Sequence, residues 1–324
     1  MTSTTADAAA ERFATEPWTA GIIGLGYVGL PLAVAATDRG LRVVGFDISS
    51  DRVASLSAGS SHVDDVSDAA LKRALAAELV VTADPSRLEA CDAIFICVPS
   101  PLGRNRQPDL TYIETAAATV ASAARPGILI SLESTTYPGT TEDLIVPAIE
   151  AAGLNLDQDA FVAFSPERVN PGGGLAPHAI PKVVGGVTEA SGRVAAAAYG
   201  RLFEAVHTVS SSRAAEMAKL LENTYRAVNI ALVNEMAQLA HELDIDIWEV
   251  IEAAATKPFG FQAFYPGPGV GGHCIPLDPQ FLAWRAREAK MATRFIDTAE
   301  QVNTAKPTYT TDRVADVLNG LGLP

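Results

Sequence analysis

The sequence predicts an α/β protein in which a doubly wound parallel sheet is followed by an all-helical domain. From residue 18 to about 205, short apolar runs alternate with Ala-rich stretches of helical composition. Several runs are almost wholly apolar, as expected for parallel strands that helices cover on both faces. From residue 211 the pattern changes to long stretches with apolar positions at three- and four-residue spacing, which is typical of helices.

The strands and helices follow from these patterns in order. The expected strands are Ala20–Gly24, Arg42–Phe46, Glu78–Thr82, Ala93–Val98, Ile128–Leu132 and Phe161–Phe164. One long helix is expected over Arg213–Leu243, because this stretch contains neither Gly nor Pro. Shorter helices are expected over Ile247–Ala255, Pro279–Glu288 and Thr293 to about Thr304.

These patterns divide the chain into four parts. Residues 1–17 are rich in Ala, Thr and Glu and are expected to form a disordered tail. The sheet domain is expected over residues 18–208, and the helical domain, interrupted by a Gly-rich loop, over residues 209–306. Residues 307–324 are expected to begin a linker, because the turn-like stretch Asn319–Gly322 resembles the lead-in to another element.

Composition restricts the class of protein. The chain has 324 residues and a formal net charge of −14, which argues against a nucleic acid or an anionic membrane as partner. No apolar stretch reaches the length that spans a bilayer, and the N-terminus lacks the pattern of a signal peptide. The 3 cysteines have no framework spacing, which favours a reducing compartment, the cytoplasm.

A glycine-rich turn after the first expected strand predicts a dinucleotide site. In Gly24-Leu25-Gly26-Tyr27-Val28-Gly29, the first Gly allows a tight turn, the second lets a pyrophosphate approach and the third permits close helix packing. The backbone of Tyr27 and Val28 leads into the helix N-terminus, whose N–H groups bind phosphates. The strand before the turn and the helix after it give this Rossmann-like motif its expected context.

Asp47 at the end of the second strand predicts NAD as the cofactor. A carboxylate there accepts hydrogen bonds from the ribose hydroxyls and repels a 2′-phosphate, although Asp47 is also placed to cap the next helix. Arg52 leaves two interpretations open, because it could bind a 2′-phosphate or only flank the adenine and pyrophosphate. Val98-Pro99 and Ser134-Thr135 end two further strands and are expected on the nicotinamide side.

Cys274 is the candidate nucleophile. It follows a run rich in Gly and Pro, Pro266–Gly272, which predicts a loop that can approach a ligand closely. Cys97 lies within an apolar run and is expected to be a small buried hydrophobe. His273 is a candidate base for its neighbour, although adjacent side chains seldom converge.

Four polar residues are candidates to assist that thiol. Lys219 and Asn223 lie four positions apart on the long helix and therefore on one face, where a solvated pair is the competing interpretation. Asp278 directly precedes Pro279, a pattern that also fits a helix N-cap. Glu167 follows an expected strand, a usual position for an active-site carboxylate in an open sheet.

A hydride-accepting cofactor combined with a nucleophilic thiol indicates a two-step oxidation. An alcohol is oxidised to an aldehyde, a thiolate traps the aldehyde, a second hydride leaves the thiohemiacetal and water releases the acid from a thioester. The oxyanions of this route need fixed donors, which a Lys ammonium and an Asn amide provide. Hydrolysis needs a base, for which Asp278 and Glu167 are both candidates.

Taken together, these residues resemble the UDP-glucose/GDP-mannose dehydrogenase family. The stretches that carry the resemblance are Gly24–Pro31, Glu133–Thr141, Ser165–Gly172, Lys219–Thr224 and Gly271–Pro276. The resemblance implies that Cys274 is the nucleophile and that Lys219 and Asn223 stabilise oxyanions. It further implies that Asp278 helps to activate the thiol and water, and that Glu167 and a threonine of Ser134-Thr135-Thr136, with Thr135 the candidate, assist thioester hydrolysis.

The resemblance also indicates the substrate. Lys257–Phe261 and Tyr265–Gly269 resemble family members that act on N-acetylated UDP-hexosamines, so UDP-N-acetylglucosamine is favoured, with UDP-N-acetylmannosamine and UDP-glucose as alternatives. The implied sugar-nucleotide contacts, besides Glu167, Lys219 and Asn223, are Arg168, Val169, Tyr265, Gly267, Gly269, Gly271 and Gly272. No metal is expected, and a homodimer through the long helix is expected, with an intramolecular core as the competing explanation for its apolar face.

Two other functions remain open. A 6-phosphogluconate or 3-hydroxyacid type dehydrogenase would share the nucleotide fold and the Lys and Asn of the long helix, but would make a single hydride transfer without a cysteine. The family has a third domain beyond the connecting helix, and the chain ends at Pro324, before such a domain is expected. A non-catalytic NAD-binding fragment is therefore the second alternative.

Overall fold

The computed structural model describes residues 5–168, 179–272 and 274–323. It contains two compact units, each described by itself. One unit comprises Met1–Gly103 and Pro108–Lys219, and the other comprises Arg104–Gln107 and Leu220–Pro324. The long helix α8 (Ser212–Glu242) contributes residues to both units.

An eight-stranded sheet forms the centre of the first unit, with the strand order β3-β2-β1-β4-β5-β6-β7-β8. The strands are β1 (Thr19–Ile23), β2 (Arg42–Phe46), β3 (Leu79–Thr82), β4 (Ala93–Ile96), β5 (Ile128–Leu132), β6 (Ala160–Phe164), β7 (Lys182–Gly186) and β8 (Val206–Val209). The strands β1–β6 are mutually parallel, which confirms the predicted doubly wound sheet. The strand β7 is antiparallel to β6, and neither β7 nor β8 was expected from the sequence.

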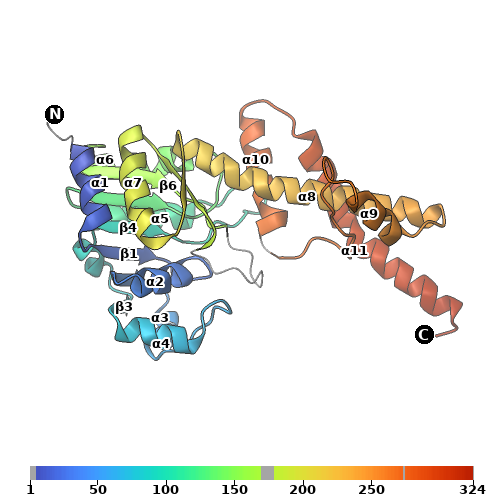
Figure 1. Ribbon diagram of the computed structural model, residues 1–324, viewed down its shortest axis with the longest axis horizontal. Helices are drawn as coiled ribbons and strands as arrows, with labels where there is room; N and C mark the ends of the chain where they lie inside the picture. The colour runs from blue at the N-terminus through green and yellow to red at the C-terminus, as the bar shows by residue number, and fades with distance from the viewer. Residues whose placement is uncertain (1–4, 169–178, 273, 324) are drawn as a thin grey trace. The chain divides into compact units, whose positions relative to one another are not determined.

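Helices cover both faces of this sheet (Figure 1). One face packs against α1 (Thr5–Thr15), α2 (Gly29–Asp38), α3 (Ser50–Ser57), α4 (Asp68–Ala76) and α7 (Glu189–Leu202). The other face packs against the 3₁₀ turn η1 (Pro85–Ala90), α5 (Thr111–Ala123), the π-helical turn η2 (Thr141–Ile145) and α6 (Val146–Ala151). Both sides of the strands are therefore buried, which explains their continuous apolar runs.

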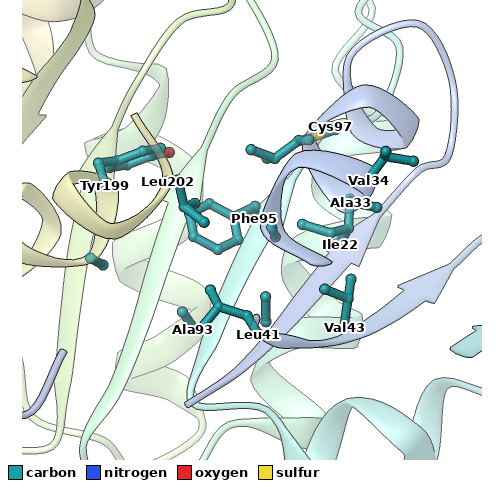
Figure 2. Close-up of a cluster of buried hydrophobic side chains, with 14 of the residues drawn as sticks. Ile22, Ala33, Val34, Leu41, Val43, Ala93, Phe95, Cys97, Tyr199 and Leu202 are labelled. Carbon is teal, nitrogen blue, oxygen red and sulfur yellow. The ribbon is translucent and has the colours of Figure 1, made fainter. Parts of the chain in front are cut away.

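Figure 2 shows the core between the central strands and the helices α2 and α7. Ile22 of β1 and Phe95 of β4 are fully buried there, and the rings of Phe95 and Tyr199 meet edge to face at 5.4 Å. Tyr199 and Leu202 come from α7, so this cluster joins the middle of the sheet to a helix late in the chain. Burial of such large side chains is the main stabilising term of the unit.

The expected disordered tail over residues 1–17 is wrong for residues 5–15, which form α1. Ala6 and Phe13 lie on one face of this helix and are buried, and α1 packs against α7. Arg12 fastens the helix further, since its guanidinium donates hydrogen bonds to Asp92 Oδ1 at 3.0 Å and to the Gly127 carbonyl at 2.8 Å. The Ala and Glu of this stretch are strong helix formers, and its few apolar residues share one side.

The second unit is helical in the part that the structure describes. It contains most of α8 together with α9 (Ile247–Ala255), α10 (Cys274–Glu288) and α11 (Arg294–Gly320). The predicted long helix and the predicted helix over Ile247–Ala255 are confirmed. The helix α11 continues beyond the expected end near Thr304 and contains Pro307 within it. Across the described ranges, no helix combines the length and apolar composition needed to cross a membrane.

Candidate active site

The glycine turn between β1 and α2 has the geometry that a dinucleotide requires. Gly24 has φ +90°, a backbone conformation that favours glycine. A Cβ on Gly29 would lie 1.9 Å from the Gly24 carbonyl oxygen, so a side chain there would break the turn. A Cβ on Gly26 would have no atom within 4 Å, which leaves open space where the sequence predicts a pyrophosphate.

The N-terminus of α2 is suited to an anion. Val28 is its N-cap residue, and no side chain caps the helix. The first N–H groups of a helix have no partner within the helix, and phosphates commonly occupy that position. Tyr27 is 70% exposed beside this end. The residues present therefore fit the pyrophosphate of NAD.

Asp47 connects the glycine turn to the end of β2. Its Oδ2 accepts the Leu25 N–H at 2.9 Å, and its Oδ1 accepts the Ser49 N–H at 2.9 Å. Burial opposes ionisation of this carboxyl, but the two backbone N–H groups and Arg52 outweigh burial and lower its pKa. Asp47 is thus held as a carboxylate, while Ser49, not Asp47, caps α3.

Arg52 pairs with Asp47. Its NH1 donates to Asp47 Oδ2 at 2.9 Å, with a partly exposed guanidinium and a buried carboxylate. The negative charge of Asp47 offsets this cation, so the pair favours ribose hydroxyls over a 2′-phosphate. Ile48, next to Asp47, is 72% exposed and provides an apolar surface that the sequence analysis did not single out.

The loops after β4 and β5 are joined by hydrogen bonds. The Ser134 hydroxyl donates to the Val98 carbonyl at 2.7 Å, and the Ser100 hydroxyl donates to the Thr135 carbonyl at 2.5 Å. Parallel strands place these loops at the same edge of the sheet as Gly24 and Asp47. Pro99 is exposed at this edge and Thr135 is partly buried.

Glu167 and Arg168 follow β6 at that edge. The Arg168 N–H donates to Glu167 Oε1 at 2.6 Å, and the Arg168 guanidinium donates to the Pro181 carbonyl at 2.8 Å. Glu167 Oε2 lies 3.7 Å from Lys182 Nζ. Two groups that the sequence analysis missed, Lys182 and Glu133, therefore lie near the predicted carboxylate. Val169, a predicted substrate contact, and His273, a candidate base, lie outside the described residues.

Cys274 is exposed, and it is the first residue of α10. The helix begins before Asp278, so the interpretation of Asp278-Pro279 as an N-cap and first turn is wrong. Proline is tolerated in the first turn of a helix, as at Pro276, whereas Pro279 lies inside α10 and has no N–H to donate to the preceding turn. Cys97 is buried as predicted, and burial raises the pKa of its thiol well above the usual value.

Within the second unit, the structure brings Asn223 and Asp278 together. The Asn223 side-chain amide donates to Asp278 Oδ2 at 2.5 Å, and both residues are buried. The competing interpretation of Asn223 as a solvated residue is therefore wrong. Lys219, one turn earlier on α8, is partly buried. The structure thus places the Asn223 amide in contact with the Asp278 carboxylate, and Asp278 lies four residues after the Cys274 thiol on α10.

The glycine-rich segment before Cys274 is held by α8. The Asn234 side-chain oxygen accepts the Gly267 N–H at 3.0 Å, and Asn234 is fully buried. Gly269 has φ +146°, and a Cβ there would lie 3.2 Å from Pro307. Tyr265 stacks on Trp248 at 6.0 Å, and Gly271 and Gly272 are exposed. Asn234 was not singled out from the sequence, because its partner is a backbone group far along the chain.

The fold and the glycine turn define a Rossmann-type dinucleotide-binding protein. The family model "UDP-glucose/GDP-mannose dehydrogenase family, NAD binding domain" matches residues 19–203, and the central domain of the same family matches residues 213–305. The chain belongs to the UDP-glucose/GDP-mannose dehydrogenase family, whose members are oxidoreductases, and its cofactor is NAD. In the described residues, no group of three or more His, Cys, Asp or Glu side chains could hold a metal ion.

Relatives agree with this assignment. The chain is 39% identical over 305 residues to protein CapL of Staphylococcus aureus, covering 93% of this chain and 70% of that protein. It is 37% identical over 302 residues to a UDP-N-acetyl-D-glucosamine 6-dehydrogenase of Pseudomonas aeruginosa, covering 92% and 70%. A solved UDP-D-ManNAc dehydrogenase of Pyrococcus horikoshii has a TM-score of 0.87 and 36% identity, covering 94% and 72%.

Proposed function

We propose that the chain oxidises C6 of a UDP-N-acetylhexosamine, with UDP-N-acetylglucosamine favoured, to the uronic acid in two NAD-dependent steps. The observation that carries this proposal is the exposed thiol of Cys274 at the start of α10, in the unit that also pairs Asn223 with Asp278. A single hydride transfer needs no nucleophile, whereas a four-electron oxidation that passes through a thioester needs a thiol. The start of a helix also stabilises an anion such as a thiolate.

Each residue has a role in this chemistry. NAD, when bound, supplies the hydride acceptor for both oxidations. The Cys274 thiolate adds to the C6 aldehyde, and oxidation of the resulting thiohemiacetal gives a thioester. Lys219 and Asn223 donate hydrogen bonds to the developing oxyanions, and Asp278 accepts the thiol proton. Glu167, assisted by Thr135, takes a proton from the water that releases the acid.

The substrate class is supported by sequence and by the relatives. The P. aeruginosa relative is named for UDP-N-acetyl-D-glucosamine, and the P. horikoshii structure for UDP-D-ManNAc. Both substrates are N-acetylated UDP-hexosamines, in agreement with Lys257–Phe261 and Tyr265–Gly269 of this chain. UDP-N-acetylmannosamine is the alternative epimer, and UDP-glucose is the alternative without an N-acetyl group.

A panel of UDP-sugars tests the proposal. With NAD in excess, the preferred sugar should yield two NADH and one uronic acid per molecule, followed by absorbance and mass spectrometry. Cys274→Ser should abolish acid release, because a hydroxyl is a much weaker nucleophile than a thiolate. Unchanged acid formation by this variant would refute the covalent route. Absence of NADH with every UDP-hexose would instead favour an NAD-binding module without this activity.

We further propose a cytoplasmic homodimer that associates through the second half of α8. Large apolar side chains there, directly after α8 and on α9 are exposed: Leu232, Met236, Leu239, Leu243, Trp248 and Val250. They adjoin an apolar cavity of about 290 Å³ between α8 and α9. A continuous apolar surface of this kind is typical of an interface between subunits.

Burial of Cys91 and Cys97 is compatible with thiols kept reduced in the cytoplasm.

A further inference from the structure

Lys182, the first residue of β7, is a cation buried beneath the predicted hydrolytic carboxylate. Its side chain is 3% exposed, and its Nζ lies 2.6 Å from Glu133 Oε2. The same Nζ lies 3.7 Å from Glu167 Oε2, and the Glu167 side chain is 25% exposed. Lys182 therefore pairs with two carboxylates: that of Glu133, which is fully buried, and that of Glu167, which reaches the surface of the first unit.

The direction of β7 explains this meeting. The parallel strands β5 and β6 end just before Glu133 and Glu167, so both carboxylates lie at the same edge of the sheet. Because β7 is antiparallel to β6, it begins at that edge, and its first residue reaches both carboxylates. The antiparallel strand β7 thus places the Lys182 cation at the edge of the sheet where β5 and β6 place the carboxylates of Glu133 and Glu167.

Aromatic groups enclose the buried pair. The Tyr199 hydroxyl donates to Glu133 and is 2.8 Å from the Ser131 hydroxyl. Lys182 Nζ lies 5.6 Å from the ring centre of Tyr199 and 5.1 Å from that of Phe203. Burial alone would lower the pKa of Lys182, but the carboxylates of Glu133 and Glu167 outweigh burial and raise it. Lys182 is therefore a cation at neutral pH.

Stability gives no sufficient reason for such a pair. A buried ion pair loses hydration, and apolar residues of similar size often replace one without loss of stability. What apolar residues could not provide is a charge beside Glu167. Arg168 supports the same arrangement, because its guanidinium bonds the Pro181 carbonyl and its N–H bonds Glu167 Oε1. Residues 167–168 and 181–182 are thus fastened to each other.

We propose that Lys182, held by Glu133, is a positioning residue that fixes the Glu167 carboxylate for thioester hydrolysis. This inference rests on the proposed function. In the hydrolytic step, water oxygen adds to the thioester carbonyl, the carbon–sulfur bond breaks to release the Cys274 thiolate, and the water proton passes to Glu167. Lys182 touches neither substrate nor cofactor in this scheme and acts only through Glu167.

The double variant Glu133→Gln/Lys182→Met tests the role. It removes both charges, so no buried ion is left without a partner, and Gln keeps an acceptor for the Tyr199 hydroxyl. The first oxidation should be unchanged, whereas thioester hydrolysis should slow by about 10- to 100-fold, since a misplaced catalytic group costs that much. The thioester should then accumulate as a covalent adduct in the mass of the intact protein.

Two variants separate positioning from stability. Tyr199→Phe removes a buried hydrogen bond to Glu133 but leaves Lys182 beside Glu167, so it should melt at a lower temperature while hydrolysis stays at the wild-type rate. Lys182→Arg keeps the cation and should hydrolyse the thioester faster than the double variant. If the double variant does not fold, Glu133→Met/Lys182→Met, which fills the same space with apolar groups, replaces it in the comparison.

The outcomes distinguish this inference from the proposed function. If wild-type protein forms no acid from any UDP-hexose, the proposed function is refuted, and this inference with it. If the wild type forms acid and a folded double variant hydrolyses its thioester at the wild-type rate, the inference alone is refuted. Equal slowing in Tyr199→Phe and the double variant would also refute it, because general loss of stability would then explain both.

Discussion

Asp47 contributes both to the predicted ribose site and to the stability of the first unit. Its carboxylate accepts the N–H groups of Leu25 and Ser49 and pairs with Arg52. These contacts lower its pKa below the ordinary value of 3.8. A carboxyl pKa that is lower in the folded state than in the unfolded state stabilises the folded protein at any pH above the unfolded-state pKa. This stabilisation is lost as the pH falls through the folded-state pKa.

Asp47→Asn should therefore weaken both folding and NAD binding. We expect a loss of about 1.5–3 kcal/mol in the free energy of unfolding at pH 7, the usual contribution of hydrogen bonds to a charged group. Urea unfolding of wild type and variant should show this difference narrowing as the pH falls below about 4. A difference that stays constant with pH would contradict the role of the ionised carboxylate.

At the scale of residues, the sequence predicted roles that depend on neighbouring residues, but not roles that depend on contacts between residues far apart in the chain. The roles of Gly24, Gly29 and Asp47 follow from a strand, a turn and a helix that are adjacent in the chain, and their geometry fits the prediction. Lys182 could not be predicted, because its partners depend on the direction of a strand that the sequence pattern did not reveal. The sequence leaves the role of Asp278 ambiguous, because an Asp directly before a Pro fits a helix N-cap as well as an active-site carboxylate.

The turn between β1 and α2 allows a paired prediction. Gly29→Ala places a Cβ 1.9 Å from the Gly24 carbonyl and should prevent folding or lower the melting temperature steeply. Gly26→Ala has open space around its Cβ, so the melting temperature should change little. The added methyl group should nevertheless obstruct the pyrophosphate and weaken NAD binding, measured by calorimetry. Normal NAD affinity in Gly26→Ala would contradict the placement of the pyrophosphate.

The segment before Cys274 should depend on Asn234. Asn234→Ala leaves the Gly267 N–H without its acceptor and should cost about 1–3 kcal/mol of unfolding free energy. Cys274 in the native protein should also react faster with iodoacetamide, because the segment that precedes it is held less firmly. Asn229→Ala on the same helix is the control, since the Asn229 amide bonds the Tyr225 carbonyl of its own helix at an exposed position. Equal effects of the two variants would contradict a specific role for Asn234.

Helices and strands were predicted best where one pattern extends over many residues. The long helix and the strands β2 and β5 match their expected ranges closely, because their periodicity or continuous burial is unambiguous. The helix α1 was missed because its apolar stripe is narrow and its composition resembles a polar tail. The strand β7 was missed because its two apolar residues lie between a lysine and two glycines, and β8 was missed because half of its residues are polar.

For the whole molecule, composition and motif order predicted the class of protein. The predicted order of a sheet domain followed by a helical domain agrees with the two family matches, the NAD binding domain over residues 19–203 and the central domain over residues 213–305. The chain spans about 70% of the length of the relatives named above. With a net charge of −14, the chain must hold the anionic pyrophosphate of NAD by local donors such as the N–H groups at the N-terminus of α2.

The proposed homodimer gives a test that needs no substrate. Leu239 is 49% exposed on α8 and lines the apolar cavity shared with α9. If a second copy covers this surface, Leu239→Glu buries an unpaired charge at the interface, which costs several kcal/mol of association free energy. Wild type should show a mass near twice 33.9 kDa in light scattering, and the variant a mass near 33.9 kDa.

The control for this prediction is a matched change on another helix. Val317 of α11 is 55% exposed, so Val317→Glu adds the same charge outside the apolar surface of α8 and α9 and should leave the dimer intact. Circular dichroism should show that both variants keep their helices, since neither residue is buried in the unit itself. A wild type that stays monomeric at micromolar concentration, or a Leu239→Glu variant that stays dimeric, would contradict association through this surface.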